Sequence, residues 1–342
     1  MFTIKDIAKM CQVSPATVSN VMNGKSNKVS KETADMILAK IAEIGYKPSM
    51  VAKGLRTRRT KIIGVIAEDI SLFNVPPIIN GITKCCEENG YMFLLENLRL
   101  YDRWGGSWFE DPIKYNTSFQ PAMAEMEAIN ADGIIYVAGH SRKINSLKQD
   151  DKRPVVVAYS VAEDNNIPQF VIDDERAACD MTNHLISKGH KKIGIIAGER
   201  SNIHTLLRID GYQRALYENG MLYDPTIVQY GLWARETGYE LAPKLIESGV
   251  TAIFCFADYI AGGVYDYLEE KGLKAGKDIA VCGFDDHEYA SYMNPKLTSM
   301  KLPTEEIGFN ATKRLIEMIE EREMDAQIEN KIPCELIGRQ SS

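Results

Sequence analysis

The chain has 342 residues, of which 45% are hydrophobic, and this composition is typical of a folded globular protein of two or three domains. No apolar run approaches the roughly 18 residues needed to cross a membrane, and Lys5, Asp6 and Lys9 interrupt any signal-peptide pattern. The seven cysteines include no C-x-x-C pair, so we expect reduced, buried thiols and a cytoplasmic location.

The charge is distributed unevenly along the chain. Residues 1–61 carry 12 Lys and Arg against 4 Asp and Glu, whereas the remaining residues carry 28 against 43. A basic head on an acidic body is typical of a DNA-binding module joined to an effector domain.

The first 23 residues predict two helices joined by a short turn. Thr3 can cap the first helix with Asp6 three residues on, Ser14 can cap the second, and Pro15 fits its first position. Apolar residues are expected to face each other across the pair: Ile7, Ala8, Val18, Val21 and Met22. The small polar residues left outside suit the major groove, so the pattern predicts a helix-turn-helix that binds duplex DNA. The alternative, a helical corner of a larger core, does not explain the positive charge.

A third helix is expected to begin after Ser30 and to end at Gly45. Its apolar residues Ile37, Leu38, Ile41 and Ile44 would close the core of a headpiece spanning residues 1–47. Residues 48–60 have too little apolar surface to fold alone and predict a hinge.

From Lys61 onward, short apolar strands alternate with amphipathic helices. One series is IIGVIAED, YMFLLEN, ADGIIYVAG and PVVVAYS, and a second is QFVIDDE, KKIGIIAG, TIVQYG, AIFCFAD and IAVCGFDD. We expect an α/β core of two lobes, each a parallel sheet with helices on both faces. A ligand would bind between the lobes at the carboxyl ends of the strands.

Several strings in this order resemble the lactose-repressor (LacI/GalR) family of bacterial transcription regulators. They are IKDIAKMCQVSPATVSNVMNG, VSKETADMILAKIAEIGYKPSMVAKGLR, RIDGYQRAL, FADYIAGGVYDYLEEKGLKAGKDIAVCGFDD, PKLTSMKLP and ELIGRQSS. The resemblance implies a periplasmic-binding-protein-like core over 61–342. The N-lobe is expected at about 61–162 and 294–324, and the C-lobe at about 163–293 and 325–342.

The resemblance also implies a homodimer on a pseudo-palindromic operator. Base contacts would come from Pro15, Ala16 and Asn20, and backbone contacts from Thr3, Ser14, Thr17, Ser19, Asn23, Asn27, Thr33 and Tyr46. Asn20 stands where family members usually have Arg, so we expect a preference for adenine over guanine. Leu55, with Arg56, would wedge into the minor groove, unless Leu55 merely packs on the body as a linker residue.

The implied effector site takes residues from both lobes: Phe73, Asn74, Arg208, Trp233 and Asp258. Each has an alternative: Arg208 could lie on the surface, Trp233 in the core, and Asp258 could cap a helix. Asp285 and Asp286 are expected to fix a strand end rather than touch a ligand. A Trp on a cleft wall beside Asp258 makes a carbohydrate the first expectation.

An apparent insertion, Tyr101–Pro112, contains Trp104 and Trp108 and is expected to form a lid or extra dimer packing.

The sequence carries no pattern for catalysis, a metal or a cofactor, so we expect a regulator and not an enzyme. The sign of control, by an inducer or a corepressor, stays open. One alternative is a regulator with an empty cleft that answers to a protein corepressor. Another is a solute-binding protein, which the basic headpiece and the missing secretion signal disfavour.

Overall fold

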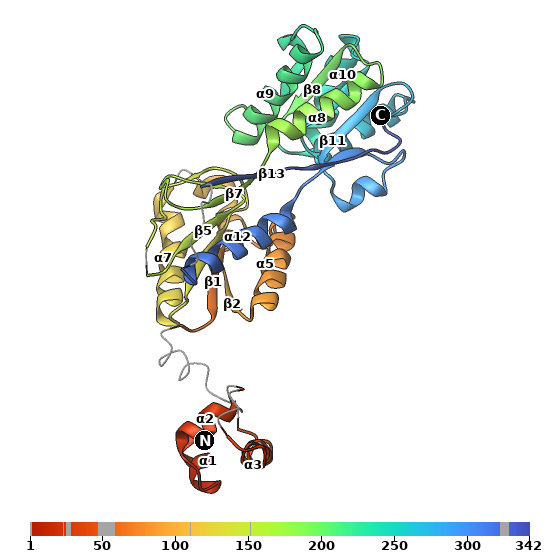
Figure 1. The fold of residues 1–342 in the computed structure, drawn as a ribbon. Helices are drawn as coiled ribbons and strands as arrows, with labels where there is room; N and C mark the ends of the chain where they lie inside the picture. The colour runs from red at the N-terminus through yellow and green to blue at the C-terminus, as the bar shows by residue number, and fades with distance from the viewer. Residues whose placement is uncertain are drawn as a thin grey trace. The chain divides into compact units, whose positions relative to one another are not determined.

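The computed structural model describes residues 2–22, 24, 29–46, 59–109, 111–150, 152–321 and 328–342. The chain divides into two compact units, Met1–Thr60 and Lys61–Ser342, and each is considered by itself (Figure 1). Within the described ranges no helix combines the length and apolar character needed to cross a membrane.

The first unit contains the three predicted helices, α1 (Ile4–Met10), α2 (Pro15–Met22) and α3 (Lys31–Glu43). The predicted helix caps are confirmed. The hydroxyls of Thr3, Ser14 and Ser30 each accept a hydrogen bond from a backbone amide three residues later in the chain, that of Asp6, Thr17 and Thr33 respectively. The fully buried residues come from all three helices and the turn: Ile7, Ala8, Cys11, Val18, Val21, Ala34 and Ile37. The prediction was wrong for Leu38, which is 51% exposed, because Ala34 and Ile37 occupy the inner face of α3.

The first sheet of the second unit has six parallel strands in the order β13-β7-β5-β3-β1-β2. Its strands are β1 (Ile62–Ala67), β2 (Met92–Asn97), β3 (Gly133–Val137), β5 (Val155–Ala158), β7 (Gln169–Ile172) and β13 (Glu329–Ile332). Helices α5 (Val75–Asn89) and α12 (Thr304–Ile319) cover one face, and α7 (Pro112–Ala128) packs on the other (Figure 1).

The second sheet also has six strands, in the order β14-β12-β11-β10-β8-β9, and only β14 is antiparallel. Its strands are β8 (Ile193–Ala197), β9 (Val228–Tyr230), β10 (Ala252–Cys255), β11 (Ala280–Asp285), β12 (Thr298–Lys301) and β14 (Glu335–Ile337). Helices α8 (Asp174–Ser187) and α9 (Ile203–Glu218) pack on one face, and α10 (Arg235–Glu247) and α11 (Asp258–Glu270) on the other. Strands β4 (Lys143–Ile144) and β6 (Val161–Ala162) form a small separate pair.

The structure corrects the predicted lobe boundaries. Strands β7 and β13, both predicted in the C-lobe, pair with each other in the first sheet, where β7 also pairs with β5. Strand β12, predicted in the N-lobe, pairs with β11 of the second sheet. The chain therefore crosses between the lobes after β7, after β12 and after β13. A short apolar run does not reveal which sheet it joins, because that depends on pairing with residues far along the chain.

The predicted insertion packs Tyr101, Trp104 and Trp108 against the core of the first lobe. Helix α6 (Leu100–Trp104) and the short helix η2 (Gly105–Trp108) lead into α7, and Trp108 is only 2% exposed. Trp108 stacks on Phe109 at 4.3 Å, and Trp104 packs against the same core. Both tryptophans thus supply apolar packing to the first lobe, and the predicted roles as a lid or as extra dimer packing stay predictions.

Candidate DNA-binding face and interlobe cleft

The outer face of α2 carries the residues predicted to read bases. Pro15 and Ala16 are exposed, and Asn20 is partly exposed. At the start of α2 the Ser14 hydroxyl lies 2.8 Å from that of Thr17, and at the start of α3 the Ser30 and Thr33 hydroxyls are equally close. Helix N-termini attract anions such as DNA phosphates, because their amide groups carry partial positive charge.

Three more residues predicted near the DNA backbone belong to the described part of the headpiece. Thr3 is exposed at the start of α1, and Ser19 and Tyr46 are partly exposed. Four predicted contacts, Asn23, Asn27, Leu55 and Arg56, lie outside the described residues.

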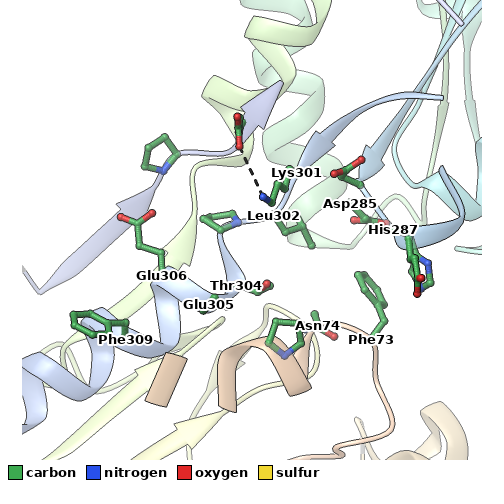
Figure 2. A pocket seen from close by; sticks show the side chains of 16 residues that line it. Phe73, Asn74, Asp285, His287, Lys301, Leu302, Thr304, Glu305, Glu306 and Phe309 are labelled. Carbon is green, nitrogen blue, oxygen red and sulfur yellow. Dashed lines mark ion pairs between the residues drawn. The ribbon is translucent and has the colours of Figure 1, made fainter. Parts of the chain in front are cut away.

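In the second unit the carboxyl ends of both sheets border a cavity of about 850 Å³, called here the larger cavity. Residues after β1, residues after β11 and two of the crossovers line it (Figure 2). Phe73 and Asn74, both predicted at the effector site, line this cavity from the first lobe. The Phe73 ring lies 5.5 Å from that of His287 in the second lobe, and the Asn74 amide donates to the Gly139 carbonyl at 3.0 Å.

The third crossover borders a smaller cavity of about 130 Å³, also lined by both lobes. The ring of Tyr159 lies 5.8 Å from that of His204 on α9. His204 Nδ1 lies 2.7 Å from a carboxylate oxygen of Asp174. His204 is 7% exposed, and its Nε2 atom has no hydrogen-bond partner among the described residues. We call the larger and smaller cavities together the interlobe cleft.

Arg208 is the most deeply buried cation of the cleft region, with 2% exposure. Its Nε donates to Asp174 at 2.7 Å, and its Nη1 donates to the Phe256 carbonyl. Although burial alone would raise the pKa of Asp174, the facing His204 and Arg208 outweigh it and lower that pKa. The guanidinium stays charged and is held in one orientation.

Two aromatic rings flank the Arg208 guanidinium. It lies 3.5 Å from the centre of the Phe284 ring and 5.8 Å from that of Trp233. The Trp233 ring in turn packs directly over Gly198, where any side chain would collide with it. The structure thus places Arg208 beside Trp233, but neither residue is among those that line the two cavities, and their contact with an effector stays a prediction.

The structure does not place Asp258 on a cavity surface. Its carboxylate is fully buried. It accepts hydrogen bonds from the His287 backbone amide at 2.7 Å and from the Ser299 hydroxyl at 2.6 Å. It is not the helix cap either, since Ala257 occupies that position. The ligand contact predicted for Asp258 is wrong in this structure, and Asp285, which was predicted only to fix a strand end, lines the larger cavity instead.

Asp258 should make folding stability depend on pH. Burial raises its pKa from 3.8 to about 7, so the folded chain binds this proton more tightly than the unfolded chain. Its contribution to stability is therefore present at pH 4 and is lost as the pH rises towards 7. We expect Asp258→Asn to remove this loss. The free energy of unfolding of the variant, relative to that of the wild type, should therefore rise by roughly 2–3 kcal/mol between pH 5 and pH 8. Thermal unfolding of both proteins across this range measures it, and a pH-independent difference would contradict it.

Sequence reasoning missed Tyr159, Asp174 and His204. Each follows or precedes a strand that borders the cleft, which was a usable signal. A lone His in a helix is more often packed into a core, and only the unpartnered Nε2 distinguishes His204. Within the described ranges no group of three or more His, Cys, Asp and Glu residues could hold a metal ion.

Comparisons with known proteins agree with this architecture. Residues 3–49 match the model for bacterial regulatory proteins of the lacI family, and residues 182–342 match a periplasmic binding protein-like domain. The chain is 32% identical to catabolite control protein A of Priestia megaterium, with 99% of each chain covered. It is also 32% identical to the transcriptional repressor PurR of Haemophilus influenzae, covering 100% of this chain and 98% of that one.

A solved structure extends the likeness to the whole fold. The transcriptional regulator CelR, in complex with cellobiose, superimposes with a TM-score of 0.64 at 25% identity, and all of both chains is covered. The chain therefore belongs to the LacI family of bacterial regulatory proteins and is a DNA-binding transcriptional regulator.

Proposed function

We propose that the protein is a transcriptional repressor that binds a pseudo-palindromic operator as a dimer and is controlled by a small molecule held between its lobes. One observation carries the proposal: a single chain joins a helix-turn-helix unit to a core whose two lobes and three crossovers border two cavities between them. PurR is named a repressor, which supports the proposed repression. The CelR structure contains cellobiose, a sugar, which supports the proposed control by a small molecule. Such a protein acts in the cytoplasm, where the chromosome is.

On the DNA side, Pro15, Ala16 and Asn20 read base edges from the outer face of α2. The residues expected at phosphates position the headpiece without reading sequence. Leu55 and Arg56 act in the minor groove, where an apolar wedge helps to bend the duplex.

On the ligand side, Phe73 and Asn74 contribute from the first lobe and Arg208 and Trp233 from the second. A ligand that touches both lobes favours one degree of closure over others. Closure moves the lobes relative to each other. In the dimer, this movement changes the way in which the two hinge segments come together. Operator and ligand binding are therefore linked, and each changes the affinity for the other by the same factor.

Salt dependence separates this function from that of a solute-binding protein. Two headpieces that each neutralise several phosphates release bound counterions from the DNA. We expect the affinity of the full chain for duplex DNA to fall about 10³-fold or more between 50 and 200 mM salt. Fluorescence anisotropy with a labelled duplex measures this fall. Weak, salt-independent binding would refute the proposal.

Asn20 should determine one base of each operator half-site. A side-chain amide pairs with adenine through two hydrogen bonds, whereas Arg pairs in the same way with guanine. We expect Asn20→Arg to shift the preferred base from adenine to guanine, with about 1–3 kcal/mol of discrimination in each protein. Selection from a random duplex pool reads out both preferences. A strong guanine already selected by the wild type would contradict the assignment.

A further inference from the structure

Lys61, which follows the predicted hinge and precedes β1, has an unusual backbone conformation. Its φ angle is 59°, in the left-handed region that residues with a side chain rarely adopt. Both of its backbone polar groups are held. The Lys61 amide donates to the Asp132 carboxylate at 2.8 Å, and the Lys61 carbonyl accepts from the Met92 amide at 2.9 Å. The chain therefore makes a fixed bend directly before the first strand of the core.

The side chain of Lys61 is held by residues from two other elements. Its ammonium group donates at 2.9 Å to Glu320, directly after α12, and lies 4.0 Å from the centre of the Tyr91 ring, directly before β2. The Tyr91 hydroxyl in turn donates to the Glu320 carboxylate at 3.4 Å. Although burial alone would lower the pKa of Lys61, its interactions with Glu320 and Tyr91 outweigh that effect and raise the pKa. We call Lys61, Tyr91, Asp132 and Glu320 together the Lys61 cluster.

The bend at Lys61 is strained, which gives the cluster a meaning beyond packing. A left-handed conformation is unfavourable for a residue with a Cβ atom, whereas glycine adopts it without that cost. Strain of this kind persists only where the surrounding contacts hold it, and it is concentrated at functional sites. Here the strained residue is the one at which the hinge meets the core, so the contacts that hold it also hold the direction of the chain.

Helix α12 connects the Lys61 cluster to the larger cavity. Thr304 and Phe309, near its start, line that cavity (Figure 2), and Glu320 follows its last residue. A helix of 16 residues spans about 24 Å. Gly308 of α12 lies against the backbone of Ile78 on α5, and this close packing leaves the helix little freedom to bend. A displacement at the cavity end of α12 therefore reaches Glu320 through one rigid element.

We propose that Lys61 is a positioning residue for operator binding: its cluster fixes the direction in which the hinge leaves the core, and Glu320 links that direction to the cavity through α12. This inference rests on the proposed function, in which Leu55 and Arg56 of the hinge act in the minor groove. A segment whose starting direction is fixed in advance loses less conformational freedom when it becomes ordered on DNA. A dimer contains the cluster twice, so each operator complex gains twice.

The first test measures the operator affinity of the full chain by fluorescence anisotropy. Lys61→Met keeps the apolar stem of the side chain but removes the ammonium group, and Glu320→Gln removes the carboxylate charge that faces it. We expect each change to weaken binding to the selected operator about tenfold or more, with little effect on binding to a random duplex. Lys61→Arg, which keeps the positive charge, should retain most of the affinity. Operator binding by Lys61→Met equal to that of the wild type would overturn the inference.

The double variant distinguishes a linked pair from two separate effects. If Lys61 and Glu320 act together, combining Lys61→Met with Glu320→Gln should weaken operator binding no more than the stronger single change does. Losses that multiply would show that the two residues act independently, and would overturn the role of Glu320 as the link to α12.

Arg153→Met controls for a loss of stability alone. Arg153 lies before β5 at the same end of the first sheet, donates to the Ala131 carbonyl at 3.1 Å and pairs with Glu127 at 3.4 Å. We expect urea unfolding to show comparable losses of stability for Arg153→Met and Lys61→Met, and only Lys61→Met to lose operator affinity. Equal losses of operator affinity in both variants would mean that stability explains the effect, and would overturn the inference.

The response to cell metabolites tests the link through α12. A protein-free extract of bacterial metabolites should change the operator affinity of the wild type about 5–150-fold, and that of Glu320→Gln much less. An equal response in Glu320→Gln would overturn the link while the proposed function stands. A wild type that binds no operator, or that does not respond to the extract, would instead contradict the proposed function itself.

Discussion

Gly308→Ala is expected to destabilise the second unit by about 3 kcal/mol or more, because the two helices that cover the first sheet touch through their backbones. A Cβ atom at Gly308 on α12 would lie 2.0 Å from the Ile78 carbonyl oxygen on α5, and one at Gly81 would lie 1.9 Å from that of Glu305. Backbone atoms cannot rotate away as a side chain can, so the helices would have to separate. Separation would open the core beneath them, where Ile78, Ile82 and Ile307 are fully buried.

A matched control distinguishes collision from the ordinary effect of replacing a helical glycine. Gly262→Ala on α11 would meet only the end of the flexible Arg235 side chain, and the helix-propensity gain of about 1 kcal/mol should offset that contact. Urea unfolding of the three proteins measures the effect. Equal stabilities for Gly308→Ala and Gly262→Ala would contradict the close helix packing.

Arg208→Met is expected to cost about 3–5 kcal/mol, since it leaves the Asp174 carboxylate buried without its guanidinium partner. Asp174 is 3% exposed, and its bond to Arg208 joins α8 to α9 at the cleft. The same change removes the cation over Phe284 and the support for the Phe256 carbonyl. We therefore expect a lower unfolding temperature and, because the cleft wall loses its shape, a lost response to the effector.

Arg214→Met provides the comparison on the same helix. Arg214 pairs with Glu175 and Glu218 but is about half exposed, and exposed ion pairs contribute about 0–1 kcal/mol. Asp174→Asn combined with Arg208→Met should recover part of the loss, because the uncompensated charge is then gone. Identical unfolding midpoints for Arg208→Met and Arg214→Met would show that the buried pair does not matter.

The headpiece could be predicted in detail because its signals are local. Thr3, Ser14 and Ser30 each cap a helix within three residues, and the spacing of Ile7, Val18 and Val21 identifies the buried side. The strands of the core were also visible as apolar runs. Their assignment to lobes was not, because β7 and β12 are placed by pairing with strands far away in the sequence.

The candidate site was predicted in part. Phe73 and Asn74, predicted from their position after the first strand, line the larger cavity, whereas Arg208 and Trp233, predicted from motifs, line neither cavity. Asp258 is buried and Asp285 lines the larger cavity, because the Ser299 hydroxyl and the His287 amide hold Asp258 inside the fold. Those partners are distant in sequence, so composition and spacing could not reveal which carboxylate lines the cavity.

The most direct measurement is the affinity of the purified chain for its best selected duplex, with and without a protein-free extract of cell metabolites. If two headpieces bind the operator as a dimer, selection from random sequence should yield an inverted repeat. Control by the cleft also predicts that the extract changes the affinity for that duplex by about 5–150-fold, the usual range of coupling between two sites. Selection of no symmetric sequence, or an affinity that the extract leaves unchanged, would contradict it.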